Sequence, residues 1–350
     1  MPESTQGVLK LAACIGNQLD LETLAIVSQS SEIVTAANLW KALQEGLILP
    51  TSDVYKFFQH SEQDSDSQPF NSHLQVPTYK FLHDRVQQAA SSLIPEDQKQ
   101  LTHLTIGQLL LQNTELTRQE ERIFEIVNQL NCGISLITLP AQRREYAQLN
   151  LKAGRKAKES IAYVATLHYL NYGMQFLTAN SWDVNADLMH SLHEEAAEVA
   201  LLNSDFLQME SLIEVVLQRT TSILQQVKVY EIKLQAYQIQ NQQREAIISG
   251  REMLEKLGVM LPESVTPLEM QQQVENTLTS VGSVAIADLV NLPQMQDANA
   301  LAALRIMTKL VPSIHQAAPQ LFPSIACEQV NLSLKYGNSP FSPPLDTSKI

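Results

Sequence analysis

A histidine and an aspartate lie next to each other where the stretch YKFLHDRVQQAASSLIP changes its periodicity. Tyr79 and Phe81 alternate with other residues as in a strand, whereas the apolar residues after His83 recur at spacings of three or four, as in a helix. The first-turn N–H groups of a helix are unpaired and suit anions, so a histidine at this junction can face a phosphate. The plainer interpretation is that Asp84 complements the helix dipole and His83 is an ordinary structural histidine.

A second group of residues with possible chemistry is in the stretch HSLHEE. Its residues His190, His193 and Glu194 are three or four apart, so one face of a helix can present them to a metal ion. The competing interpretation is a solvated helix face that lies opposite the apolar positions Leu188, Leu192, Ala196 and Val199. A metal-dependent enzyme is therefore one alternative for this chain.

Sequence motifs of common catalytic sites are missing from the chain. It contains no glycine-rich phosphate loop ending in Lys and Ser or Thr, no GxSxG turn, no paired-cysteine metal pattern and no kinase catalytic loop. We therefore expect the chain itself to be non-catalytic and to hold no cofactor or metal of its own.

Composition favours a cytoplasmic protein with protein partners. The net charge of −13 opposes binding to nucleic acid or to anionic lipid, since both require clustered Lys and Arg. The 350 residues contain no apolar run long enough for a membrane span and no signal peptide. The three cysteines, Cys14, Cys132 and Cys327, are far apart and odd in number, which suits buried, reduced thiols.

The first 94 residues have the element order of a winged helix. We expect Asp20 to cap the second helix and Gly46 to end the third. The expected helices are 6–15, 21–28 and 33–44, and the expected strands are 47–50, 54–58 and 78–82. The third helix would read DNA, but it offers only Lys41 beside Glu45 and no arginine. A winged-helix transcription regulator with a helical sensor region is the second alternative.

Almost everything after His83 is expected to be helical. Helices are predicted at about 96–112, 117–132, 267–280, 298–311 and 321–336. Between them, the stretches 158–173, 202–217 and 240–255 each place a polar turn before a helix, at spacings of 44 and 38 residues. Helix pairs that recur at such a period stack into a solenoid. The pattern predicts a mainly α protein, a winged helix followed by a tetratricopeptide-like α-solenoid.

Several stretches together resemble the large bacterial, mainly cyanobacterial, multidomain signalling kinases. The resemblance runs from about residue 6 to 339 and is carried by LKLAACIGNQLDLETLAIVSQ, LWKALQEGLILP, FLHDRVQQAASSLIPEDQKQLTHLTIGQLLLQ and LSLKYGNSP. Proteins of this class combine a Ser/Thr kinase, an AAA-like signal-transduction ATPase, helical repeats, a GAF sensor and often a histidine kinase. The resemblance implies a regulatory, protein-interacting part of such a protein.

The resemblance also implies a role for the histidine–aspartate pair. The wider ATPase class has an apolar-His-Asp motif whose histidine touches the β-phosphate of bound ADP, and Leu82-His83-Asp84 is similar to it. By this likeness His83 is a nucleotide sensor and Asp84 caps the following helix. ATP or ADP with Mg²⁺ belongs to the intact family, so the role requires the ATPase core outside this chain.

The same resemblance suggests how the chain is divided. We expect the end of the ATPase module at 1–94, a helical connector at 95–140, the solenoid at 141–338 and a disordered tail at 339–350. We expect the chain to be a fragment from a split or frameshifted gene, with the missing ATPase, kinase and sensor domains as partners. The final helix has no capping repeat after it and is expected to self-associate. Its apolar residues are Leu321, Ile325, Val330, Leu332 and Leu334.

Overall fold

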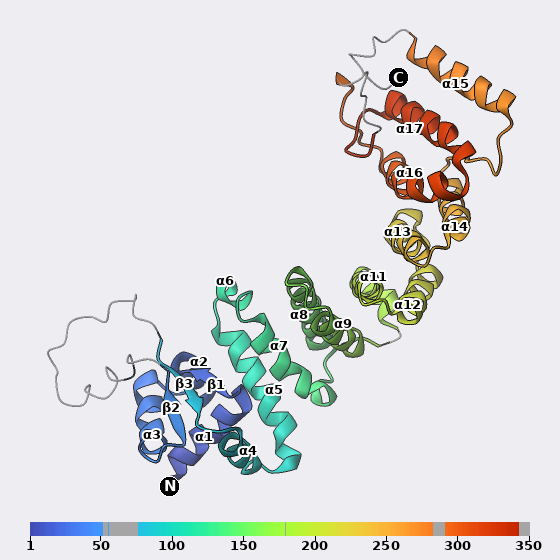
Figure 1. Cartoon of the computed structure of the whole chain (residues 1–350). Helices are drawn as coiled ribbons and strands as arrows, with labels where there is room; N and C mark the ends of the chain where they lie inside the picture. The colour runs from blue at the N-terminus through green and yellow to red at the C-terminus, as the bar shows by residue number, and fades with distance from the viewer. Residues whose placement is uncertain (52–54, 56–75, 179, 283–290, 343–350) are drawn as a thin grey trace. The chain divides into compact units, whose positions relative to one another are not determined.

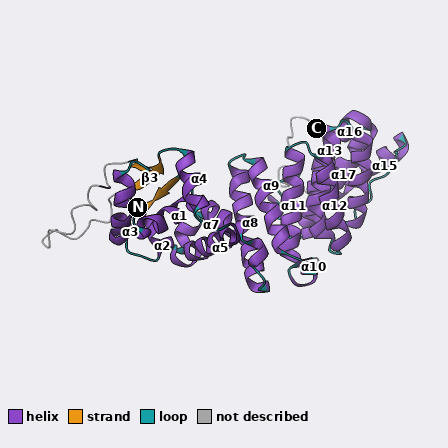
Figure 2. Cartoon of the chain, turned by 90° about the horizontal axis from the view of Figure 1, so that it is seen from below, coloured by secondary structure: helices purple, strands orange, loops and turns teal. Residues whose placement is uncertain are grey.

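The computed structural model describes residues 1–51, 55, 76–178, 180–282 and 291–342. Its described part is mainly helical, with three short strands near the N-terminus (Figures 1 and 2). The chain forms two compact units: unit 1 comprises Met1–Lys156 and Tyr172–Thr178, and unit 2 comprises Ala157–Asn171 and Ala179–Ile350. Within the described ranges no helix is both long and apolar enough to cross a membrane.

Unit 1 begins with helices that surround a small antiparallel sheet. The strand order is β1-β3-β2, with Leu19 opposite Tyr79 and Ile48 opposite Phe81. The elements are α1 (Glu3–Ile15), β1 (Gln18–Asp20), α2 (Leu21–Ser28), α3 (Glu32–Gln44), β2 (Ile48–Pro50) and β3 (Thr78–Phe81). The three predicted helices and two of the predicted strands are confirmed within a few residues, whereas β1 was not predicted. The strand expected at 54–58 lies almost wholly outside the described residues.

The ends of α2 and α3 are set by the capping residues that the sequence indicated. The Asp20 carboxylate accepts a hydrogen bond from the Thr23 N–H at 2.6 Å, which caps α2. Gly46 has a φ of +67°, a left-handed conformation that suits the glycine after the end of α3. Tyr79 and Phe81 on β3 are buried against the apolar faces of α1 and α3, so the sheet and the helices share one core.

The remaining helices of unit 1 pack through close backbone approaches. They are α4 (Asp84–Ser92), α5 (Glu96–Asn113), α6 (Leu116–Gln119), α7 (Ile123–Cys132), the 3-10 helix at Ile134–Leu136 and most of α8 (Pro140–Glu159). A Cβ at Gly107 would lie 2.8 Å from the Leu130 side chain, so α5 and α7 need this glycine to pack. The single helix predicted at 117–132 is wrong, because the chain turns between α6 and α7. Cys14 is buried as expected, but Cys132 is exposed.

Helical hairpins with the same turn recur in unit 2. Each of three turns contains one residue with left-handed backbone: Ile161 in the first, Ser204 in the second and Asn241 in the third, with φ of 60°, 59° and 58°. The residue after it donates its N–H to a carbonyl five positions back, as from Asp205 to Ala200 at 2.8 Å. The helices of this part are α9 (Tyr163–Phe176), which begins in unit 2 and ends in unit 1, α10 (Ser181–Val184), α11 (Ala186–Leu202), α12 (Phe206–Arg219), α13 (Ile223–Ile239) and α14 (Gln243–Lys256). The predicted repeat of a polar turn before a helix is confirmed.

The C-terminal part of unit 2 is α15 (Pro267–Val281), α16 (Ala298–Ala317), the 3-10 helix at Pro319–Leu321 and α17 (Phe322–Tyr336). The final helix is packed on its inner side: α15 lies against α17, and Leu321 and Ile325 are buried in the core of α13–α16 (Figure 1). Its expected self-association stays a prediction. Of the tail predicted to be disordered, residues 339–342 are described. There, the Ser342 hydroxyl is hydrogen bonded to Ser333 at 2.9 Å.

Candidate functional site

The histidine–aspartate pair lies at a strand-to-helix junction, as the sequence predicted. β3 ends at Phe81, and α4 begins at Asp84. His83 takes the N-cap position with extended backbone, at φ −146° and ψ 152°, and its side chain makes no capping hydrogen bond. The expectation that Asp84 caps this helix is therefore wrong. Because Asp84 is the first helical residue, its charge acts on the helix dipole instead.

Both side chains of the pair are accessible. His83 and Asp84 are exposed, and the His83 imidazole makes no hydrogen bond with the described residues. Among the residues that the structure describes, the ring therefore has no hydrogen-bond partner, and it lies beside a helix N-terminus, where unpaired N–H groups favour negative charge. This arrangement can donate one hydrogen bond to an anion, but it holds no second basic side chain within the Leu82-His83-Asp84 motif.

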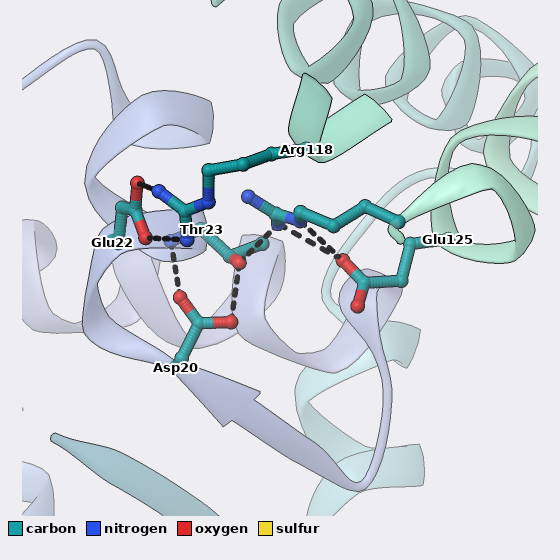
Figure 3. Close-up of polar contacts among 6 residues, drawn as sticks. Asp20, Glu22, Thr23, Arg118 and Glu125 are labelled. Atoms are coloured by element: carbon teal, nitrogen blue, oxygen red, sulfur yellow. Dashed lines mark hydrogen bonds and ion pairs between the residues drawn. The ribbon is translucent and has the colours of Figure 1, made fainter. Parts of the chain in front are cut away.

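A polar network connects α2 with α6 and α7, and sequence reasoning missed it (Figure 3). Its first part is Asp20, which accepts hydrogen bonds from the Thr23 N–H and, at 2.5 Å, from the Thr23 hydroxyl. Thr23 in turn accepts a short hydrogen bond from the guanidinium of Arg122. Arg122 also donates to Glu125 from Nε at 3.0 Å and from Nη2 at 2.9 Å.

A second arginine makes a separate link between the same helices. Arg118 on α6 donates two hydrogen bonds to the Glu22 carboxylate on α2, at 2.8 and 3.0 Å (Figure 3). This is the bidentate geometry that fixes a guanidinium against a carboxylate. Together, the two arginines fasten the sheet-containing part of unit 1 to the helices that follow it.

The proposed metal cluster on α11 is not assembled. His193 is buried, and its Nδ1 is 2.7 Å from the Met189 carbonyl, while His190 Nε2 is 2.8 Å from the Gln225 carbonyl. Burial lowers the pKa of His193. Among the described residues, no group of three His, Cys, Asp or Glu side chains is placed to hold a metal ion. The expectation of a solvated face is also wrong for His193, because α11 is covered by its neighbours.

The exposed face of α3 is apolar rather than basic. Ile33, Val34 and Trp40 are 53%, 50% and 42% exposed. The one lysine of this helix, Lys41, forms an ion pair with Glu45 at 2.9 Å. A helix that reads DNA needs several free cations to contact phosphates, whereas α3 carries one lysine, and that lysine is paired with Glu45.

Comparison with known proteins gives one significant relative. The chain is similar to hybrid signal transduction histidine kinase G of Dictyostelium discoideum, with 25% identity over 303 residues. The alignment covers 75% of this chain and 9% of that protein, so the chain spans less than a tenth of its relative's length. Neither unit alone holds three quarters of the chain, so the similarity extends into both. No protein-family profile matches the chain, and no solved structure matches it significantly.

Proposed function

We propose that this chain is a regulatory and protein-interaction part of a multidomain signalling kinase and is itself non-catalytic. The observation that carries the proposal is the similarity to a hybrid histidine kinase across both units. The chain corresponds to 9% of that protein, which leaves room for catalytic domains outside the matching part. The missing partners are then the ATPase, kinase and sensor domains of the same signalling protein.

The fold supports a winged helix followed by an α-solenoid. The order helix, strand, two helices and two strands, with β3 between β1 and β2, is the arrangement expected for a winged helix. Hairpins that repeat one left-handed turn, at Ile161, Ser204 and Asn241, are what a degenerate solenoid requires. Solenoids present long surfaces to other proteins, which fits a regulatory part better than a catalyst.

The apolar face of α3 favours a protein-binding rather than a DNA-binding winged helix. With its lysine paired to Glu45, the helix has no free cation to release counterions from DNA. A gel-shift experiment with random duplex DNA at physiological salt tests this choice. We expect no shift, whereas a shift that is lost at high salt would favour the transcription-regulator alternative.

We propose further that His83 contacts a nucleotide phosphate when an ATPase core is supplied. Its exposed, unbonded imidazole at the start of α4 fits that role. A hydrogen bond to a charged phosphate is worth roughly 1.5–3 kcal/mol, so His83→Ala should weaken ADP binding by about ten- to a hundredfold. Affinities of the reconstituted ATPase that agree within about twofold would leave His83 as a structural histidine.

The regulatory role is tested by deleting residues 1–350 from a multidomain kinase that contains them and measuring autophosphorylation. We expect phosphoryl transfer to persist, because the proposal places no catalytic group in this chain. We also expect the rate of autophosphorylation to respond differently to the regulatory signal once the chain is removed. Loss of phosphoryl transfer that is restored only by adding back this chain would assign it a catalytic part instead.

A further inference from the structure

A cavity of about 370 Å³ lies in unit 1 between α5, α6 and the first turns of α8, three helices labelled in Figure 1. Each helix contributes residues three or four positions apart, so one face of each helix is turned to the cavity. Four glutamines, Glu145 and Tyr146 line it together with Leu111 and Leu116. The volume and the converging polar side chains are typical of a small-molecule site.

The polar atoms that this cavity offers are mainly hydrogen-bond acceptors. Gln119 donates from Nε2 to the carbonyls of Leu111 and Thr114, at 2.9 and 3.0 Å. Both partners are acceptors, so the side-chain oxygen of Gln119 is the group that remains for a ligand. The Glu145 carboxylate is exposed and forms no ion pair with the residues that the structure describes. A ligand that donates hydrogen bonds fits these atoms.

The charge around the cavity favours a cation. Among the described residues, no lysine or arginine lines it, and Glu145 is its one charged side chain. Leu111 and Gln112 belong to the last turn of α5, where the free carbonyls carry the negative end of the helix dipole. A carboxylate and a helix C-terminus therefore both attract positive charge to the same cavity, whereas a phosphate or another anion is repelled.

The apolar part of the lining is open to a ligand. Leu116 is 81% exposed and Leu111 is half-buried, so neither side chain is enclosed in the core. Tyr146 is buried, and its hydroxyl accepts a hydrogen bond from Gln108 at 3.3 Å. This tyrosine forms the inner wall of the cavity. An aliphatic chain can lie on the two leucines while its charged ends reach the acceptors.

We propose that the cavity between α5, α6 and α8 binds a small aliphatic diamine, with its ammonium groups at Glu145 and at the Gln119 side-chain oxygen. The methylene chain then covers Leu111 and Leu116, which removes apolar surface from water. An ammonium group donates three hydrogen bonds and accepts none, which matches an acceptor-rich lining. The inference goes beyond the proposed function and does not rest on it, because the chain alone supplies the whole site.

Isothermal titration calorimetry of diaminobutane into the full chain tests the proposal. We expect saturable binding that Glu145→Gln weakens about three- to tenfold, because a partly exposed charged hydrogen bond is lost. Gln112→Lys places a cation beside the ligand and should weaken binding about tenfold or more. The matched control Gln88→Lys makes the same change at an exposed position of α4 and should bind within about twofold of the unchanged chain.

Three results would overturn the assignment: no saturable binding of diaminobutane, equal weakening by Gln112→Lys and Gln88→Lys, or equal binding of butanediol, which has the same carbon chain without the charges. Equal weakening would mean attraction to the net charge of −13 alone. The autophosphorylation experiment is independent of this test. A chain that regulates the kinase but binds no diamine loses only the cavity site, and a chain that binds the diamine without affecting the kinase loses only the regulatory role.

Discussion

Arg122 and Arg118 differ in how far water reaches their side chains. The Arg122 side chain is 10% exposed and is shared between Thr23 and Glu125, whereas Arg118 is 47% exposed and pairs with Glu22 alone. Exposed ion pairs contribute little because water screens them, but removing a buried partner leaves polar groups unsatisfied. The two arginines should therefore contribute unequally to the stability of unit 1.

Replacement of Arg122 by alanine should lower the free energy of unfolding of unit 1 by about 1–3 kcal/mol. The matched change Arg118→Ala should cost about 0–1 kcal/mol. Urea denaturation followed by circular dichroism measures both. If the Arg118 variant proved the less stable of the two, the assignment of Arg122 as the main link would be wrong.

His193 gives unit 2 a pH dependence. The buried imidazole disfavours its charged form, so its pKa in the folded chain is lower than the value of about 6.5 for an unfolded histidine. Below that pH the unfolded state binds a proton more readily than the folded state, so stability falls as the pH drops.

The substitution His193→Gln should reduce this loss of stability between about pH 6.5 and 5. Glutamine keeps a donor for the Met189 carbonyl but does not titrate. Thermal midpoints of both proteins across this range provide the measurement. Parallel curves for the variant and the unchanged chain would show that His193 is not the titrating group.

Sequence reasoning placed His83 at a strand-to-helix junction but missed the arginine network, and the difference has a physical reason. His83 was placed correctly because a change of periodicity is a local signal. The links from Arg118 to Glu22 and from Arg122 to Thr23 join residues 96 and 99 positions apart, and nothing local marks such partners. Spacing likewise put His190 and His193 on one helix but carried no information on burial.

At the scale of elements, one hairpin turn contains a residue that is poorly suited to it. Ile161 holds a φ of 60° and is 72% exposed, so its β-branched side chain adds strain without adding packing. Asn241 occupies the equivalent position of another hairpin, where asparagine tolerates the left-handed conformation.

We expect Ile161→Gly to stabilise the chain by up to about 1 kcal/mol, because glycine adopts positive φ without steric cost. The reverse change at the matched turn, Asn241→Ile, should destabilise by about 1–2 kcal/mol. Thermal unfolding of the two variants tests the pair. A destabilised Ile161→Gly variant would mean that the isoleucine side chain makes contacts worth more than its strain.

Most helices were predictable, and the exceptions have identifiable causes. The three residues of β1 carry no strand pattern, so only pairing with β3 defines them. The helix expected to end at 311 continues to Ala317 across Pro312, because Ser313 and Ile314 are fully buried and hold the next turn. In such places tertiary packing decides what local propensity does not.

At the scale of the molecule, two compact units and stacked hairpins should make unfolding gradual. Repeats interact mainly with their neighbours, and each unit has its own core. We expect differential scanning calorimetry to give a calorimetric enthalpy larger than the van't Hoff enthalpy. One sharp transition with equal enthalpies would contradict the proposed solenoid.

The central claim, that the chain regulates and binds but does not catalyse, is tested most directly by phosphate release from ATP. The purified chain is incubated with ATP and Mg²⁺, since the proposal gives it no residues that position a metal-bound triphosphate. We predict release at the background rate, unchanged by His83→Ala. Turnover that co-purifies with the chain and falls when one of its own residues is substituted would contradict the account.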